Sequence, residues 1–393
     1  MPSAADRTRR LGLSLGVTLF IVIVGVGCGP PPPPTDTLSV ARSLGGPPAE
    51  GFARALEVQP IAWPADHGAH RAFQTEWWYF TGHLAAEGGR RFGYQLTFFR
   101  QALAPPGSTP PRTSKWATDQ AILAHFAVTD VGDQNFHSFE RWSREALGLA
   151  GVTGAEDLRV WIGDWRAVRD SGAATDRFRL QAAEDTIALD LELEATVDPI
   201  LHGDQGLSRK GHEAGNASYY FSLPRLTSRG TLRIGTETYS VTGRSWLDRE
   251  WSTSVLEGQI GWDWFSLQLS DGSDLMAFRL RRPDGTADPA SAGTLVTRDD
   301  NDRVLDRRTF TAADLRFSEV RYWTARDGAA RYPVAWRLEI PSAGLELAID
   351  PLIDPQELTL AFRYWEGAVR ARGRRGREDI TGFGYLEMTG YTR

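Results

Sequence analysis

Apolar and polar residues alternate along most of this chain, and this period-two pattern restricts the possible folds more than any other feature. Alternation places the apolar side chains on one face of an extended strand. The clearest segments carry these same-face residues: Phe92, Tyr94, Leu96 and Phe98; Ile187, Leu189, Leu191, Leu193 and Ala195; Val334, Trp336, Leu338 and Ile340; Leu345, Leu347 and Ile349; Leu358, Leu360, Phe362 and Tyr364. No stretch holds a helical period over three turns. We therefore predict an antiparallel all-β fold, either a barrel or a sandwich.

Turn signals separate several of these segments. Asp271-Gly272 lies between the apolar runs Trp264–Leu269 and Leu275–Leu280, and such a dipeptide is a strong hairpin signal. Residues 341–344, which read Pro-Ser-Ala-Gly, separate two further alternating segments. Strands that follow one another in the chain are therefore expected to pair.

A short element occurs twice, which suggests a duplication. Val241–Asp248 and Ile380–Glu387 both contain Thr-Gly, two further residues, an aromatic residue, leucine and an acid. The two copies would place equivalent strands near the ends of two halves. We expect the boundary close to residues 251–258, with one domain at 59–252 and a second at 253–393.

The N-terminus follows the template of an exported protein. Three arginines precede an uncharged, mostly apolar stretch at 11–26, which is short for a membrane span of about 20 residues. Cys28, the single cysteine of the chain, follows directly. We predict a lipoprotein signal peptide over 1–27 and a lipid on Cys28. Because no second cysteine exists, the folded part contains no internal disulfide.

Two other outcomes for this segment stay open. Gly25 occupies the position where lipoprotein signals usually carry leucine, so ordinary signal-peptide cleavage or an uncleaved anchor is also considered. In each case the fold lies outside the cytoplasm, in the bacterial cell envelope. Residues 28–58, which include the run Pro30–Pro34, would form a linker that holds the fold off the membrane.

Charge and aromatic content limit the partners of the chain. The net charge is −6, and basic residues form no continuous stripe, so a nucleic-acid partner is excluded. The chain contains 14 tryptophans, which either fill the cores of large β domains or line a cavity for a ligand. The second interpretation predicts a hydrophobic or amphiphilic small molecule as partner.

Aromatic and ionisable residues are densest in four segments, the first of which is 76–83. Adjacent residues of a strand point to opposite faces, so one of Trp77 and Trp78 is expected in a core. The other, with Glu76 or His83, would line a pocket.

The second and fourth segments contain one candidate each. In 122–130, His125 lies opposite the apolar face; a hydrogen-bonded, half-buried structural histidine is the alternative to a functional one. In 261–265, Asp263 is flanked by Trp262 and Trp264.

The third segment, 245–251, gives the strongest pattern. Trp246, Asp248 and Glu250 share one face of an extended strand. Pairing of the two acids with Arg244 or Arg249 is the structural alternative.

Such a set of residues is suited to acid–base chemistry. A carboxyl group beside indole is desolvated, which raises its pKa toward the range of a general acid. We predict that these residues converge on one concave site: as catalytic candidates Asp248, Glu250, Asp263 and His125, and as ligand-binding candidates Glu76, Trp77, Trp78, Trp246, Trp251, Trp262 and Trp264. Asp248 ranks first because it lies between Trp246 and Trp251 in the chain, and Asp263 ranks second.

Other kinds of site lack their sequence signals. The chain has no HExxH motif and no cysteine cluster, and its histidines are scattered, so no metal site is expected. No GxSxG elbow and no glycine-rich phosphate loop occurs, so no cofactor is expected either.

Several motifs, in the same order, resemble a known family. They include Thr75-Glu-Trp-Trp-Tyr-Phe-Thr-Gly82, Trp246-Leu-Asp-Arg-Glu-Trp251, Gly261-Trp-Asp-Trp-Phe265, Tyr364-Trp-Glu-Gly-Ala-Val369 and Gly384-Tyr-Leu-Glu-Met-Thr-Gly-Tyr391. From about Phe73 to its end the chain resembles the lipocalin-like secreted hydrolases, which are related to the carotenoid 1,2-hydratases (hydroxyneurosporene synthases) and to AttH-type proteins. The resemblance implies two consecutive lipocalin-like β-barrel domains packed together.

The resemblance also implies a chemistry. The hydratase branch adds water across a terminal C=C bond of an acyclic carotenoid without a cofactor, starting from protonation by a carboxyl group. We therefore expect an envelope lipoprotein that acts on an apolar or amphiphilic ligand as a hydratase or hydrolase. A non-catalytic carrier of hydrophobic ligands on the same fold is the alternative, and a structural envelope protein would require exposed, paired acids.

Overall fold

The computed structural model describes residues 50–110, 113–154, 158–253, 258–299 and 301–392, all within one compact unit. Cys28 and the predicted signal peptide lie outside these residues. Within the described part, no helix has the length and apolar character needed to cross a membrane.

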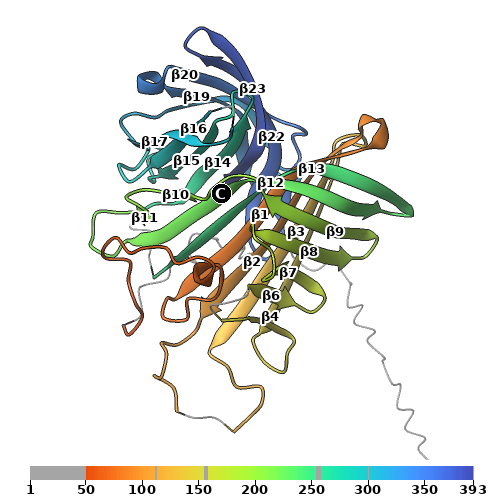
Figure 1. Cartoon of the computed structure of the whole chain (residues 1–393), viewed down its shortest axis with the longest axis vertical. Helices are drawn as coiled ribbons and strands as arrows, with labels where there is room; N and C mark the ends of the chain where they lie inside the picture. The colour runs from red at the N-terminus through yellow and green to blue at the C-terminus, as the bar shows by residue number, and fades with distance from the viewer. Residues whose placement is uncertain (1–49, 111–112, 155–157, 254–257, 300, 393) are drawn as a thin grey trace, which may run out of the picture. The chain divides into compact units, whose positions relative to one another are not determined.

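In the described residues, the first sheet contains thirteen strands and almost closes into a barrel (Figure 1). Its strands are β1 (Thr75–Ala86), β2 (Arg91–Ala102), β3 (Gln120–Asp130), β4 (Asn135–Arg144), β5 (Ala150–Val152), β6 (Arg159–Ile162), β7 (Trp165–Arg169), β8 (Arg177–Glu184), β9 (Ile187–Ala195), β10 (Ile200–Leu201), β11 (Leu207–Arg209), β12 (Ala217–Ile234) and β13 (Glu237–Ser252). The order is β4-β3-β2-β1-β13-β12-β9-β8-β7-β6-β5, with β10 and β11 paired to β12. The two ends of this strand order approach each other, since β4 at one end contacts β5 and β6 at the other.

The second sheet contains ten strands in the part of the chain that the structure describes, and it forms about half a barrel. Its strands are β14 (Gly261–Leu269), β15 (Asp274–Arg281), β16 (Ala292–Arg298), β17 (Val304–Thr311), β18 (Arg316–Thr324), β19 (Arg331–Ile340), β20 (Leu345–Pro351), β21 (Glu357–Thr359), β22 (Arg363–Arg375) and β23 (Glu378–Met388). The order is β17-β16-β15-β14-β23-β22-β20-β19-β18, with β21 paired to β22.

The all-β fold class is confirmed. All strand pairs are antiparallel in the described residues, and the helices there are three short 3₁₀ turns: η1 (Ala65–His67), η2 (Glu87–Gly89) and η3 (Pro341–Ala343). The first sheet ends at Ser252 and the second begins at Gly261. Whether 59–252 and 253–393 behave as separate domains stays a prediction.

The alternating pattern places side chains as expected in most strands. In β9, Ile187, Leu189 and Leu191 are buried, whereas Asp190 and Glu192 lie on the outer face. The predicted hairpin at Asp271-Gly272 is present between β14 and β15.

One predicted strand, 358–364, is wrong. The chain instead reverses there, so that Leu358 on β21 pairs with Tyr364 on β22. The hairpin buries Leu358, Phe362 and Tyr364 in a small cluster with Leu123 of β3. In a single straight strand Leu358 and Tyr364 would instead lie about 20 Å apart.

Each sheet encloses its own apolar core, and a third cluster lies between the sheets. Trp78 and Phe80 of β1 belong to the first core, whereas Tyr79 faces the other way and packs against the second sheet. We call this third group the inter-sheet cluster: Tyr79, Tyr220, Trp246, Trp264, Met276, Phe278, Leu280, Ala368 and Tyr385. It draws on β1, β12 and β13 of one sheet and on β14, β15, β22 and β23 of the other.

The sheets approach closely at Gly93 of β2. A Cβ atom on Gly93 would lie 2.6 Å from Cβ of Ala368 and 2.8 Å from the hydroxyl of Tyr385. Because real Cβ atoms do not come so near to other atoms, glycine at this position permits the contact between the sheets.

Candidate active site

A row of polar side chains crosses five adjacent strands of the first sheet. The strand register places His125 (β3), Thr97 (β2), Tyr79 (β1), Asp248 (β13) and Ser222 (β12) opposite one another. Residues directly opposite in antiparallel strands share a face, and Tyr79 shows that this face is turned toward the second sheet. The strand register therefore places one row of polar side chains, from strands far apart in the sequence, on the face turned toward the second sheet.

A matching row in the second sheet faces it. Glu366 (β22), Glu387 (β23), Trp264 (β14) and Phe278 (β15) lie opposite one another in the register. One hydrogen bond joins the rows, from the hydroxyl of Tyr79 to Oε1 of Glu366. A second joins the two sheets beside them, from Nε1 of Trp264 to the hydroxyl of Tyr220 at 3.0 Å.

The repeated sequence element relates the two rows. Asp248 and Glu387 are the acids that end its two copies, and both lie between two strands of their sheet in the same way. Tyr79 and Trp264 stand on one side of these acids, and the other side holds Ser222 in the first sheet but a carboxyl group in the second.

Asp248 is buried among neutral donors. Its Oδ1 accepts hydrogen bonds from the hydroxyl of Ser222 and from Nε1 of Trp246 at 2.6 Å, and its Oδ2 accepts one from the hydroxyl of Tyr220 at 2.6 Å. The side chain is 3% exposed. Burial raises the pKa of Asp248 to about 7, although the three hydrogen bonds oppose this rise.

A buried histidine extends this group. Nε2 of His202 lies 2.6 Å from the hydroxyl oxygen of Ser222, and its ring packs on Tyr220 with 4.3 Å between centroids. Burial keeps the pKa of His202 well below its ordinary value, so the ring is neutral. A neutral ring adds no positive charge that would pull the pKa of Asp248 down.

Two further carboxyl groups share the space. Burial raises the pKa of Glu387 to about 8, against a hydrogen bond from Trp262 and with added repulsion from Asp248. The pKa of Glu366 lies well above its ordinary value, first because of burial and then because of the charge of Glu387. Like charges this near cannot all be ionised together, so at least one carboxyl keeps its proton at neutral pH.

Glu250 has a different environment although it shares the face of Asp248. Nζ of Lys210 lies 3.1 Å from its Oε1 and also sits over the ring of Phe278 from the second sheet, 4.3 Å from the centroid. The ammonium group of Lys210 compensates the negative charge of Glu250, so Glu250 is less suited than Asp248 to proton transfer. Trp77, opposite Glu250 in the register, is half-buried on the same face.

Three of the predicted site residues in the first sheet do not join Asp248. Glu76, Trp78 and Trp251 lie on the opposite face of β1 and β13. Trp78 is part of the first core, and Trp251 stacks on the ring of His70 at 3.8 Å. The expectation that Trp251 would enclose Asp248 was wrong, because the two residues are three positions apart on one strand and so point to opposite faces.

Glu76 is instead the centre of a buried ion-pair network. Its carboxylate accepts hydrogen bonds from Arg100 and, at 3.2 Å, from Nη2 of Arg249. These charges hold the pKa of Glu76 well below its ordinary value in spite of burial. Arg249 is therefore the partner of Glu76 and not of Asp248.

Asp263 also lies apart from the site. Its carboxylate is paired with Arg279 at 2.8 Å and Arg281 at 3.3 Å, and it accepts a hydrogen bond from Tyr391 at 2.9 Å. Trp262 and Trp264 flank it in sequence but point to the other face, where both pack at the inter-sheet cluster. The prediction that Asp263 converges with Asp248 was therefore wrong.

His125 reaches the inter-sheet space from the end of the polar row. Its Nδ1 lies 2.7 Å from the hydroxyl oxygen of Tyr364 on β22, and its Nε2 lies 3.0 Å from Oε2 of Glu140 on β4. The ring is 1% exposed.

The sequence analysis missed most of the partners of Asp248. The site also contains Tyr79, Lys210, Tyr220, Ser222, His202, Tyr364, Glu366 and Glu387. Glu387 had a detectable signal, because it occupies the position of Asp248 in the second copy of the repeated element.

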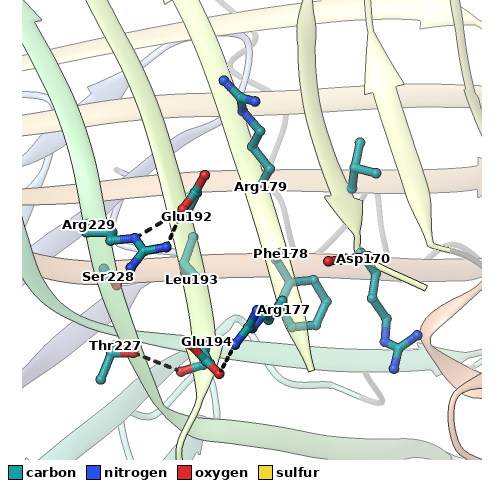
Figure 2. A pocket seen from close by; sticks show the side chains of 12 residues that line it. Asp170, Arg177, Phe178, Arg179, Glu192, Leu193, Glu194, Thr227, Ser228 and Arg229 are labelled. Atoms are coloured by element: carbon teal, nitrogen blue, oxygen red, sulfur yellow. Dashed lines mark hydrogen bonds and ion pairs between the residues drawn. The ribbon is translucent and has the colours of Figure 1, made fainter. Parts of the chain in front are cut away.

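A separate groove of about 620 Å³ lies over β7, β8, β9 and β12 (Figure 2). Its charged residues pair with one another, as in Arg177 with Glu194 at 2.7 Å and Arg229 with Glu192 at 2.9 Å. The groove contains none of the residues of the two rows, so we do not assign the site there. Among the residues that the structure describes, no group of three or more His, Cys, Asp or Glu side chains is arranged to hold a metal ion.

Comparisons with known proteins agree with this architecture. A family model described as AttH-like matches residues 54–391. The dehydratase AsqC of Emericella nidulans is 23% identical over 297 residues, which cover 70% of this chain and 83% of that protein.

Two solved structures share the fold. A putative AttH from Nitrosomonas europaea has a TM-score of 0.74 and 36% identity, covering 87% of this chain and 100% of the other. Kievitone hydratase from Nectria haematococca has a TM-score of 0.66 and 16% identity, covering 87% and 97%. The AttH-like match, residues 54–391, spans both sheets.

Proposed function

Because this chain belongs to the AttH-like family and is related to dehydratases, we propose that it is an acid–base hydratase or dehydratase. Its substrate is an apolar or amphiphilic molecule bound between the two sheets, beside the aromatic residues of the inter-sheet cluster. The proposal needs no group beyond the side chains of this chain.

The observation that carries the proposal is the pair Asp248 and Glu387. The two acids occupy matching positions on facing sheets, and their pKa values are raised to about 7 and about 8. At neutral pH a carboxyl group with a pKa of 8 is mostly protonated, whereas one with a pKa of 7 is half ionised. The site therefore offers a proton donor and a proton acceptor at once.

This arrangement matches the two proton transfers of a dehydration. Glu387 donates its proton to the leaving hydroxyl group, the C–O bond breaks, and Asp248 takes a proton from the adjacent carbon as the C=C bond forms. Water and alkene are the products. In hydration the roles exchange: Asp248 protonates the alkene, and Glu387 accepts a proton from the attacking water.

The test is incorporation of labelled oxygen. The purified protein is incubated with a panel of apolar alkenes in oxygen-18 water, and the products are analysed by mass spectrometry. We expect labelled alcohol from at least one alkene, with a rate about 10²-fold lower in Asp248→Asn and in Glu387→Gln. Glu192→Gln, the same kind of change on the exposed face of β9, serves as the matched control.

The result also separates the enzyme from a carrier. If no alkene is labelled, and native mass spectrometry shows an apolar ligand that co-purifies equally with the wild type and with Asp248→Asn, the protein is a carrier of hydrophobic ligands and the acid–base proposal is wrong.

We further propose that the protein works at the bacterial envelope, held to a membrane surface by a lipid on Cys28. The position of Cys28 directly after the apolar stretch supports this proposal. Cys28→Ser should move the protein from the membrane fraction to the soluble fraction or block its processing. A Ser variant that stays membrane-bound with unchanged mass would replace the lipid by an uncleaved anchor.

A further inference from the structure

The inter-sheet space contains a hydrogen-bonded chain of three ionisable side chains that the proposed reaction does not use. It runs from Glu140 on β4 through His125 on β3 to Tyr364 on β22 of the second sheet, with contacts of 3.0 Å and 2.7 Å. Glu140 is half-buried, whereas His125 and Tyr364 are almost fully buried. This series of hydrogen bonds therefore connects a partly exposed carboxylate with the interior of the site.

The direction of these hydrogen bonds follows from charge. Burial disfavours the ionised form of Glu140, but hydrogen bonds from His125 and Trp142 outweigh this and lower its pKa, so Glu140 is a carboxylate. Burial lowers the pKa of His125, and Glu140 offsets this only in part, so the ring is neutral. A neutral ring that donates Nε2–H to a carboxylate has a bare Nδ1, which accepts the hydroxyl proton of Tyr364.

At Tyr364, the inner end of this hydrogen-bonded series, unpaired polar atoms are placed to bind a polar atom of a ligand. Nε2 of Gln95 donates to the hydroxyl oxygen of Tyr364 at 3.1 Å. In the described part of the chain, Oε1 of Gln95 and Oε2 of Glu366 are buried and have no hydrogen-bond partner. Tyr364 and Glu366 are two residues apart on one strand face, about 7 Å between their Cα atoms, so a single polar group could bridge their side chains.

We propose that Tyr364 is a second proton-transfer residue of this site, that His125 takes up its proton, and that Glu140 is a positioning residue that orients and stabilises His125. The inference rests on the proposed function and names the subsite for the oxygen that is added or lost. A hydroxyl group or water held by Gln95 and Glu366 passes its proton to the oxygen of Tyr364, while the proton of Tyr364 moves to Nδ1 of His125. The carboxylate of Glu140 stabilises the imidazolium that forms, and the return transfer restores all three groups.

The first test needs no substrate. In the ¹⁵N NMR spectrum of histidine-labelled protein, His125 should be neutral with its proton on Nε2 at pH 7, and protonated only below its ordinary pKa of about 6.5. The ionisable groups that face it are Glu140 on one side and Tyr364 on the other. Glu140→Gln should lower the pKa of His125 further, because the carboxylate that favours imidazolium is gone. Tyr364→Phe should shift the Nδ1 resonance toward that of a nitrogen without a hydrogen bond.

A matched control is His137→Gln, which removes the half-buried histidine on the neighbouring strand and should leave the resonances of His125 unchanged. A proton found on Nδ1 of His125 in the wild type would overturn the inference, because Tyr364 could not then donate to it. This outcome leaves the proposed function of Asp248 and Glu387 untouched.

The second test uses the substrate identified with labelled water. Tyr364→Phe and His125→Gln should lower kcat about 10²-fold with KM within about twofold, and Glu140→Gln should lower kcat about tenfold. Loss of packing alone would raise KM and lower Tm instead. Full activity of Tyr364→Phe, with Asp248→Asn inactive, would overturn the inference and keep the proposed function.

Discussion

The two faces of strands β1 and β13 both hold buried acids, but they treat these acids in opposite ways. On the inner face, which also carries Trp78 of the first core, Glu76 is paired with Arg100 and Arg249, and these charges lower its pKa. On the outer face, which is turned toward the second sheet, Asp248 accepts hydrogen bonds from the neutral donors Ser222, Trp246 and Tyr220, and burial raises its pKa. Burial is therefore not what marks the site. The difference lies in the neighbouring charges. An acid paired with guanidinium groups stays ionised and stabilises the fold, whereas an acid without such a partner has a raised pKa and is suited to proton transfer.

The largest effect expected from this comparison is on stability at the inner face. Glu76→Gln leaves two buried guanidinium groups without their carboxylate, so the free energy of unfolding should fall by about 3–5 kcal/mol. Urea denaturation measures this change, with Glu192→Gln as an exposed control that should stay within about 0.5 kcal/mol. A loss below about 1 kcal/mol would mean that the two faces do not differ as described.

The pH dependence of stability should have opposite signs for the two faces. The folded protein keeps the proton of Asp248 up to about pH 7, whereas the unfolded chain releases it near pH 4, so stability falls as pH rises between these values. Glu387 adds a second fall that ends near pH 8. Glu76 acts the other way: its contribution is present above about pH 4.5 and is lost as pH falls below that value.

Denaturation curves between pH 4.5 and 8.5 test this sign. The double variant Asp248→Asn/Glu387→Gln should remove most of the fall seen in the wild type, because each raised pKa contributes several kcal/mol to it. An equal slope in both proteins would show that neither acid is protonated in the fold.

The contact at Gly93 offers a way to disturb the outer face alone. Gly93→Ala puts a methyl group against Ala368 and should cost about 1–3 kcal/mol, because the sheets must separate to admit it. Ala368→Gly in the same chain should restore part of the loss, which a double-mutant cycle measures. Additive losses would show that the two residues do not meet.

The smallest change in stability should come from the residue most important for activity. Asp248→Asn replaces a carboxyl group that is half neutral at pH 7 by an amide of the same shape. We expect a loss of about 1 kcal/mol in the free energy of unfolding, together with the loss of activity described above. A loss as large as that of Glu76→Gln would place Asp248 among the structural acids.

The sequence predicted the strands well, because burial and alternation are local properties. It also grouped Trp246, Asp248 and Glu250 on one face, as the structure does. The same period-two rule, applied to the next tryptophan of the strand, would have excluded Trp251 from the side of Asp248; closeness in the chain was given too much weight. Asp263 failed for the same reason, since it points away from both of its neighbours.

The remaining partners depend on strand register, which a single sequence does not reveal. Ser222 meets Asp248 because β12 pairs with β13 in one alignment, and Tyr364 meets His125 only when the two sheets pack. Long-range register is decided by the whole pattern of turns and cores, and a shift of one residue would have turned these side chains away.

The two facing rows correspond position by position, but only the acids Asp248 and Glu387 are of the same kind, so the two walls differ chemically. Two identical walls would accept an elongated molecule equally well either way round. Here a serine hydroxyl on one wall corresponds to the carboxyl group of Glu366 on the other, and Tyr79 corresponds to Trp264. The second wall thus carries two carboxyl groups, Glu366 and Glu387, where the first carries one, Asp248. If the proposed substrate, with a polar head and an apolar tail, binds between these unlike walls, one orientation of it should be favoured over the reverse.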